Sequence, residues 1–147
     1  MSNQVNPELI NTLESYNVRK AAECFNCGNC TAICPFTTDE YPFPRNMIRQ
    51  IQIGGAAKLK QSIDPWLCYY CGDCTQTCPR GAEPAETMMA TRRWLTAQYD
   101  RSGEGDKLYT SERAVAWKIV QYVLLTLSAF LIYHIVTGGT HLVTDHV

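Results

Sequence analysis

Two short stretches, CFNCGNCTAICP at residues 24–35 and CYYCGDCTQTCP at residues 68–79, contain all eight cysteines of the 147-residue chain. Each cysteine of the first stretch recurs 44 positions later in the second. The glycine, the threonine after the third cysteine and the closing proline recur at the same interval. The two stretches are therefore copies of one internal repeat with the pattern C-x2-C-x2-C-x3-C-P.

This spacing predicts two 4Fe-4S clusters. Three thiolates on one tight loop reach three irons of a cubane, and the fourth iron takes a cysteine from elsewhere, which in two-cluster ferredoxins comes from the other motif. We therefore predict that the two motifs exchange their last cysteines. The predicted ligands of cluster one are Cys24, Cys27, Cys30 and Cys78, and those of cluster two are Cys68, Cys71, Cys74 and Cys34.

Other residues of the repeat are expected to shape the loops. Gly28 and Gly72 permit backbone conformations that a Cβ atom would forbid, and Pro35 and Pro79 redirect the chain. Two alternatives remain open. Four-thiolate zinc sites also use C-x2-C pairs, although a third close cysteine followed by C-P is not typical of them. A disulfide framework would require an oxidising compartment.

Charge and the N-terminal residues bear on compartment and partners. The formal net charge is −1, from 13 basic and 14 acidic residues, so nucleic acid is not an expected partner. Residues 1–8 lack the basic and apolar segments of a signal peptide. We therefore expect the cysteines to lie in a reducing cytosol, where metal binding is more common than disulfide formation.

Helical patterns predict an all-α fold, with a two-cluster α-helical ferredoxin domain over residues 1–100. Asn6 and Pro7 form a helix start, and a helix is expected from about residue 7 to residue 22. Further helices are predicted at residues 45–51, ended by Gly54-Gly55, at residues 56–61 and at residues 84–95. No run alternates apolar and polar residues long enough to indicate a sheet.

The C-terminal part is predicted to be a flexible linker at residues 101–112, a single transmembrane helix at residues 113–137 and a short extracytoplasmic tail at residues 138–147. Residues 119–136 carry no charged side chain and span roughly 27 Å as a helix, which is enough to cross the hydrocarbon of a membrane. Basic residues precede this segment and none follows it, so the cysteine domain is expected on the cytoplasmic side of the cytoplasmic membrane. A buried core helix is the alternative.

The segment WLCYYCGDC at residues 66–74, together with Cys78-Pro79-Arg80 and MMATRR at residues 88–93, resembles the C subunit of heterodisulfide reductase. The resemblance covers residues 22–100 and is closest to the ferredoxin-like N-terminal part of the quinone-interacting membrane-bound oxidoreductase C subunit. It implies an α-helical ferredoxin fold. It also implies electron transfer between a soluble flavin or iron-sulfur subunit and a membrane subunit with haem b and quinone.

The chain departs from both relatives in its membrane part. The soluble subunit has no span, whereas the quinone-linked subunit continues into a multi-helix domain that this sequence lacks. Haem b and flavin are therefore expected on partner subunits. No catalytic residue is predicted, because every cysteine is committed to a cluster and no G-x-G-x-x-G loop indicates a flavin or nicotinamide site. A redox sensor that carries no catalytic current is the rival function.

Three features have weaker functional claims. His134, near the outer end of the span, is a candidate haem ligand, and an interfacial histidine is the alternative. Arg92-Arg93 is a candidate docking site for an acidic redox partner, and a solvated helix face is the alternative. One stripe of the predicted span could pack against a membrane subunit or face lipid, and it contains Lys118, Tyr122, Thr126, Ala129 and Tyr133.

Overall fold

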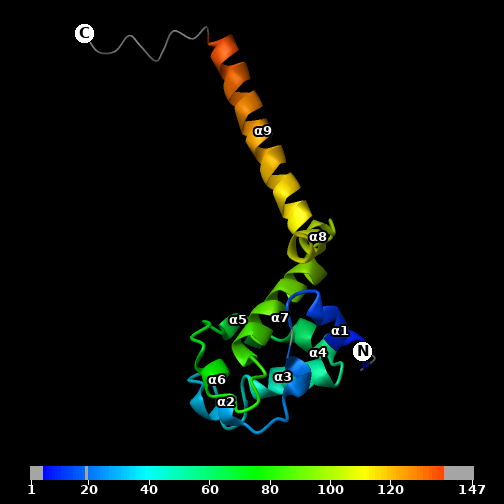
Figure 1. Ribbon diagram of the computed structural model, residues 1–147, viewed down its shortest axis with the longest axis vertical. Coiled ribbons are helices and arrows are strands. Elements are labelled where there is room, and N and C mark those ends of the chain that lie inside the picture. The colour runs from blue at the N-terminus through cyan, green and yellow to red at the C-terminus, as the bar shows by residue number, and fades with distance from the viewer. Residues whose placement is uncertain (1–4, 19, 138–147) are drawn as a thin grey trace, which may run out of the picture. The chain divides into compact units, whose positions relative to one another are not determined.

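The computed structural model describes residues 5–18 and 20–137, and within these ranges it contains helices and loops but no strand (Figure 1). The all-α fold class is thereby confirmed. The chain divides into two compact units, of which the first ends at Thr110 and the second begins at Ser111. The elements are α1 (Leu9–Glu14), η1 (Ala21–Glu23), α2 (Asn29–Ile33), α3 (Arg45–Gln52), α4 (Ala56–Gln61), α5 (Asp64–Leu67), α6 (Asp73–Gln76), α7 (Pro84–Tyr99), α8 (Glu104–Thr110) and α9 (Glu112–Val136).

The expectation of one helix over residues 7–22 was wrong, because the chain leaves the helix at Asn17. Asn17 has a φ of +73°, a left-handed conformation that asparagine tolerates after a helix end. Its N–H donates to the Glu14 carbonyl at 3.0 Å, and the N–H of Val18 donates to the Leu13 carbonyl at 3.1 Å. These two bonds form a Schellman motif. Helix α1 is therefore short, and the 3-10 helix η1 leads into the first cysteine motif.

The start of α1 is joined to the end of α3 by a close backbone contact. The N–H of Asn6 donates to the Gly54 carbonyl at 2.8 Å, and the Asn6 side chain accepts from the N–H of Glu8 at 3.1 Å. Gly54 has a φ of +73°, and a Cβ there would lie 2.2 Å from the Asn6 carbonyl oxygen. Both the conformation and the contact require glycine. The predicted end of the middle helix at Gly54-Gly55 is confirmed.

One apolar core joins α1, α3, α4 and α7. Its largest fully buried side chains include Leu9, Leu13, Met47, Ile48, Ile51, Leu59, Met88 and Leu95. Burying each such side chain contributes about 1.5–3 kcal/mol to stability. Three cysteines, Cys24, Cys34 and Cys68, pack partly against this core. The core therefore fixes the points at which both motifs begin and the point at which the first ends.

The predicted flexible linker at residues 101–112 was wrong for Glu104–Thr110, which forms α8. The Asp100 carboxylate accepts from the N–H of Ser102 at 2.8 Å and from the N–H of Gly105 at 2.6 Å. The Tyr16 hydroxyl, which follows α1, donates to Asp106 in α8. The hydrogen bonds of Asp100 and Tyr16 hold residues 104–110 against the rest of the first unit. This unit therefore extends beyond the predicted boundary at residue 100.

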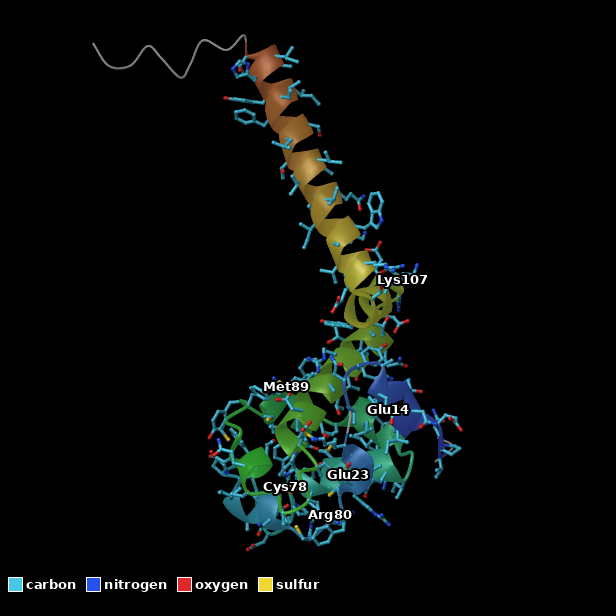
Figure 2. The ribbon with its side chains drawn as sticks, in the orientation of Figure 1. Glu14, Glu23, Cys78, Arg80, Met89 and Lys107 are labelled. Atoms are coloured by element: carbon cyan, nitrogen blue, oxygen red, sulfur yellow. The ribbon has the colours of Figure 1, made fainter. Side chains whose placement is uncertain are left out.

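Helix α9 forms the described part of the second unit. Ser111 caps its start and accepts from the N–H of Ala114 at 3.4 Å. The helix runs from Glu112 to Val136, which agrees with the predicted helix at residues 113–137 to within a residue. The helix is long and apolar enough to cross a membrane, and its apolar window is not buried, since side chains project on all sides (Figure 2). Residues 138–147, the predicted tail, lie outside the described residues.

Candidate iron-sulfur centre

The two cysteine motifs adopt the same backbone conformation. Gly28 and Gly72 have φ values of +92° and +87°, which confirms the expectation that these positions use conformations unfavourable for a side chain. Two positions before each glycine, Asn26 and Tyr70 also have positive φ values, +59° and +62°. The sequence repeat is therefore a structural repeat, including two left-handed residues that the motif pattern did not predict.

A short helix follows each glycine and gives equivalent cysteines equivalent exposure. The carbonyl of Gly28 accepts from the N–H of Thr31 in α2, and the carbonyl of Gly72 accepts from the N–H of Thr75 in α6, each at 2.9 Å. The third cysteine of each motif, Cys30 or Cys74, is buried, whereas the second, Cys27 or Cys71, is exposed. The first and fourth cysteines are intermediate in both motifs. All eight are free thiols, so no disulfide framework is present.

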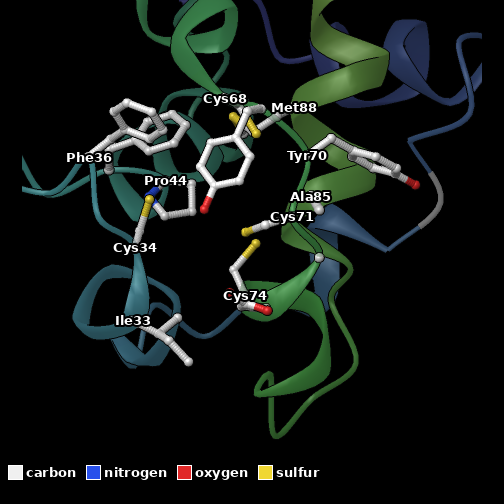
Figure 3. A pocket seen from close by; sticks show the side chains of 14 residues that line it. Ile33, Cys34, Phe36, Pro44, Cys68, Tyr70, Cys71, Cys74, Ala85 and Met88 are labelled. Carbon is white, nitrogen blue, oxygen red and sulfur yellow. The ribbon is translucent and has the colours of Figure 1, made fainter.

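Cys34 lies on the wall of the same cavity as the first three cysteines of the second motif. Figure 3 shows Cys34, Cys68, Cys71 and Cys74 approaching this cavity from different sides. Apolar residues complete most of the lining, namely Ile33, Phe36, Phe43, Pro44, Ala85 and Met88. The structure thus gathers the four residues predicted as ligands of cluster two.

The first motif and Cys78 are joined less directly. After burial, negative charge on Cys24 and on Cys27 raises the pKa of the Cys30 thiol, so the three sulfurs lie near one another. Cys78 follows α6, and the Asn29 amide of α2 donates to the Thr77 carbonyl beside it at 3.0 Å. This bond brings the end of the second motif to the helix that carries Cys30. No described contact joins Cys78 to Cys24, Cys27 or Cys30 itself.

The donor set and its surroundings fit an iron-sulfur cluster. In the part of the chain that the structure describes, no three histidine, cysteine or acidic side chains converge on the position of a single metal ion. A four-thiolate zinc site holds each sulfur about 2.3 Å from one ion, whereas a cubane holds its four thiolates around a larger body. The Thr31 hydroxyl is buried beside Cys30 and interacts with its sulfur.

Backbone N–H groups point at two of the sulfurs. The N–H of Asn26 donates to Cys24 Sγ at 3.4 Å, and the N–H of Ala82 donates to Cys78 Sγ at 3.3 Å. Such bonds favour the negatively charged thiolate and contribute to the reduction potential of a cluster. They also fix the side-chain direction of the first cysteine of one motif and the last cysteine of the other.

Burial opposes ionisation of several thiols. Burial raises the pKa of Cys74 to about 11, and the neighbouring sulfurs, Cys30 first, add to the shift. Burial also raises the pKa of Cys30 and that of Cys34. These thiols therefore hold their protons at neutral pH unless a cation compensates the thiolate charge. Binding of iron supplies that compensation, so assembly of a cluster releases protons.

One buried contact links the two sets of cysteines. Cys30 of the first motif and Cys74 of the second form a small buried cluster with Ala85 at the start of α7. The short helices that carry them, α2 and α6, pack against each other (Figure 1). Whatever the two motifs bind therefore lies close together, separated by the side chains of two cysteines.

One long side chain holds the backbone at the first cysteine of each motif, and neither role was predicted from the sequence. The Gln52 amide donates to the carbonyls of Ala21 and Cys24 at 3.0 and 2.6 Å. Arg92 donates to the carbonyls of Pro65, Trp66 and Cys68, and its guanidinium lies 6.0 Å from the Trp66 ring centre. Neither role is recognisable from local sequence, because each side chain lies more than 20 residues from the carbonyls to which it donates.

Arg92 and Arg93 both donate to backbone carbonyls. Arg93 donates twice to the Tyr16 carbonyl, at 3.3 and 3.1 Å, while Arg92 is engaged with α5 and Cys68. Each arginine satisfies carbonyls near a helix end, where cationic donors are favourable. Both side chains are partly exposed, and docking of an acidic partner at this pair stays a prediction.

Residues 14–83 match a family model described as a 4Fe-4S dicluster domain. The matched segment contains both motifs and ends just before α7. A search of curated proteins found no match. The helical fold and the cysteine-lined centre thus define an iron-sulfur protein. The match supports a ferredoxin-like protein within that class.

Proposed function

We propose that the chain binds two 4Fe-4S clusters and relays single electrons. The proposed ligands are Cys24, Cys27, Cys30 and Cys78 for cluster one and Cys68, Cys71, Cys74 and Cys34 for cluster two. The observation that carries the proposal is the position of Cys34, which lines a cavity with three cysteines of the other motif. Exchange of the last cysteine between motifs is the wiring of two-cluster ferredoxins.

The chain's own residues support a relay. When bound, each cluster supplies one-electron redox chemistry at a potential set by its surroundings. The contact between Cys30 and Cys74 keeps the two sets of ligands adjacent, which suits transfer between them. The apolar lining of the Cys34 cavity limits access of water. The cysteines are proposed as cluster ligands, and no residue is assigned to making or breaking covalent bonds in a substrate. The proposed role is therefore that of a non-catalytic subunit.

Helix α9 is the proposed membrane anchor, crossing the cytoplasmic membrane once. Its length and composition support this role. The Thr126 hydroxyl donates to the Val123 carbonyl at 2.9 Å, and the Ser128 hydroxyl donates to the Leu125 carbonyl at 2.8 Å. Inside a membrane these two hydroxyls would therefore need no partner outside the helix. The basic residues that precede α9 support a cytoplasmic position for the first unit.

The partners are proposed from the resemblance to heterodisulfide reductase C subunits and their quinone-linked relatives. A soluble flavin or iron-sulfur subunit would exchange electrons with this chain on one side, and a cytochrome b-like membrane subunit with quinone on the other. His134, whose ring centre lies 6.4 Å from that of Phe130, would face such a subunit as a haem ligand. One histidine supplies only one axial position, so the partner would supply the second.

Anaerobic purification in detergent tests the relay. About eight iron and eight acid-labile sulfide per chain are expected, with reversible reduction and copurification of flavin or haem subunits that reduce the clusters when their donor is supplied. Zinc without sulfide would contradict cluster binding. Intact clusters that no copurified subunit reduces would instead favour the redox sensor. In a separate test of the anchor, a high-salt wash without detergent should leave the protein in the membrane fraction, and quantitative release would contradict a span.

A further inference from the structure

Two arginines on α3 lack internal partners, unlike Arg92 and Arg93. Arg45 and Arg49 are four residues apart on α3 and therefore neighbours on its surface. Among the described residues, neither arginine side chain makes a hydrogen bond or an ion pair. Like charges at this spacing repel each other, so the pair slightly destabilises an isolated helix. An external anionic partner would remove that repulsion.

These arginines lie beside the first cysteine motif. The Arg45 guanidinium is so close to the loop that a Cβ on Gly28 would lie 3.2 Å from it. Two adjoining hollows in the surface share Phe25, Asn26 and Arg49; Arg45 lines one and Cys24 the other. We call these five residues the basic face. Positive charge, an open surface and a predicted cluster ligand therefore occur at one place.

An exposed aromatic side chain lies in the middle of the basic face. Phe25, between Cys24 and Asn26, is 60% exposed. A single exposed aromatic residue is common on protein surfaces, but this one is flanked by unpaired arginines and touches both hollows. Aromatic and arginine side chains are enriched where proteins bind proteins. The composition of the face therefore fits a protein surface better than a small anion.

The equivalent part of the second motif has a different character. The side chain nearest a Cβ on Gly72 is the neutral Gln76 amide, at 4.0 Å. Nearby Glu86 accepts from the Tyr70 hydroxyl, and Asp73 begins α6. Exposed Arg80 is the one basic residue of residues 68–80, and Asp73 in the same stretch is acidic. Glu23 is the exposed acidic residue beside the first motif, against the two arginines of α3. The first motif is therefore better suited to an acidic partner than the second.

We propose that the basic face docks the acidic surface of a soluble electron-transfer protein, which exchanges electrons with the cluster of the first motif. The proposal rests on the proposed relay function. A surface of two arginines beside one aromatic is too small for nucleic acid, and the net charge of −1 gives no wider basic field. Charged residues of this kind at a docking surface act chiefly on the rate of association and on its dependence on salt.

Stopped-flow kinetics with a protein probe of chosen charge tests the docking face. Full-length protein with its clusters, in uncharged detergent, is reduced and mixed with cytochrome c made acidic by succinylation of its lysines. One electron leaves a reduced cluster, which is oxidised, and converts the ferric haem of the probe to ferrous haem. Each rate is divided by the rate of the same variant with neutral p-benzoquinone, which corrects for changes in the clusters themselves.

The double variant Arg45→Glu/Arg49→Glu should react about 10-fold or more slowly with the acidic probe at low salt, and faster with unmodified, basic cytochrome c. Both effects should fade as salt is added. Arg45→Gln/Arg49→Gln should show a smaller loss. The control Lys58→Glu/Lys107→Glu has the same change in net charge, but its residues lie on α4 and α8, outside both hollows.

The docking role of the basic face and the relay function can be contradicted separately. If the α3 variants and the control slow the acidic probe equally, only net charge matters and the basic face is rejected, while the relay stands. If the reduced wild-type protein transfers no electrons to p-benzoquinone or to either probe, the relay itself is contradicted.

Discussion

At the scale of single residues, the side chains that hold the first cysteine of each motif are as informative as the cysteines. Arg92 donates to three carbonyls around Cys68, and Gln52 performs the corresponding task at Cys24. Each hydrogen bond to a charged donor contributes about 1.5–3 kcal/mol, and lysine cannot reproduce the planar geometry of arginine. The two residues act on different motifs and are natural controls for each other.

We expect Arg92→Lys to impair the cluster of the second motif and Gln52→Ala to impair that of the first. The reason is that each change releases the backbone at one motif and leaves the other intact. Paramagnetic resonance of the reduced protein measures the two signals separately. Loss of the same signal in both variants, or no loss in either, would show that these side chains do not position the motifs independently.

Gly28 gives a second prediction at this scale. Gly28→Ala places a side chain at a φ of +92° and 3.2 Å from the Arg45 guanidinium, so both strain and contact oppose it. The left-handed conformation alone costs about 1–2 kcal/mol. Iron and sulfide per chain should fall. Gly103→Ala is the control, because its φ of +68° is also left-handed but no atom lies within 4 Å and no cysteine is near in sequence. Equal loss in both variants would argue against a role for Gly28 in the loop.

At the scale of elements, α8 depends on one carboxylate. A hydrogen bond from the Ser102 hydroxyl, followed by N–H groups of Gly105 and Ser102, lowers the pKa of Asp100 to about 2 from its usual 3.8. Because the folded-state pKa is depressed, the stabilisation is complete above about pH 3.8 and is lost as the pH falls toward 2. At neutral pH the carboxylate is fully ionised.

Asp100→Asn should therefore loosen α8 at neutral pH while leaving the clusters unchanged. The amide keeps one acceptor but loses the charge that strengthens the bond from the N–H of Gly105. Hydrogen exchange of residues 104–110 should become faster, with the core of α7 as the internal reference. Unchanged exchange in this segment would contradict the assigned role of Asp100.

The same segment shows which elements were predictable from sequence. Helices α3, α7 and α9 were predicted because long periodic or apolar runs and clear end signals define them, such as Gly54-Gly55. The end of α1 at Asn17 was not predicted. A helix end of this kind is often accompanied by burial of the next residue, here Val18, and this burial depends on the tertiary fold. Helix α8 was missed because its support comes from Asp100 and from Tyr16, far away in sequence.

The candidate site divides in the same way. The repeat predicted the special backbone at both glycines, because spacing within a loop is a local property. The exchange of the last cysteines between motifs stays a prediction. The roles of Gln52, Arg92 and Arg45 were not predictable, because each depends on how α3 or α7 packs against a motif. Local pattern thus indicates the candidate ligands, and tertiary packing defines what surrounds them.

At the scale of the whole molecule, the division at Thr110 predicts that the two units can be separated. The core and all eight cysteines belong to the first unit, and α9 contributes no buried residue to it. A chain ending at Thr110 should therefore be recovered in the soluble fraction with the iron and sulfide content of the full chain. Loss of the clusters on truncation would show that the first unit needs α9.

The account as a whole depends on the exchange of the last cysteines between motifs. Paramagnetic resonance and Mössbauer spectra of Cys34→Ala and Cys78→Ala, each compared with the wild-type protein, test it most directly. The account predicts that each variant alters one four-cysteine cluster and keeps the other, with Cys34→Ala affecting the cluster bound by Cys68, Cys71 and Cys74. Two undisturbed four-cysteine clusters in both variants, or loss of the cluster of the mutated motif itself in each, would contradict it.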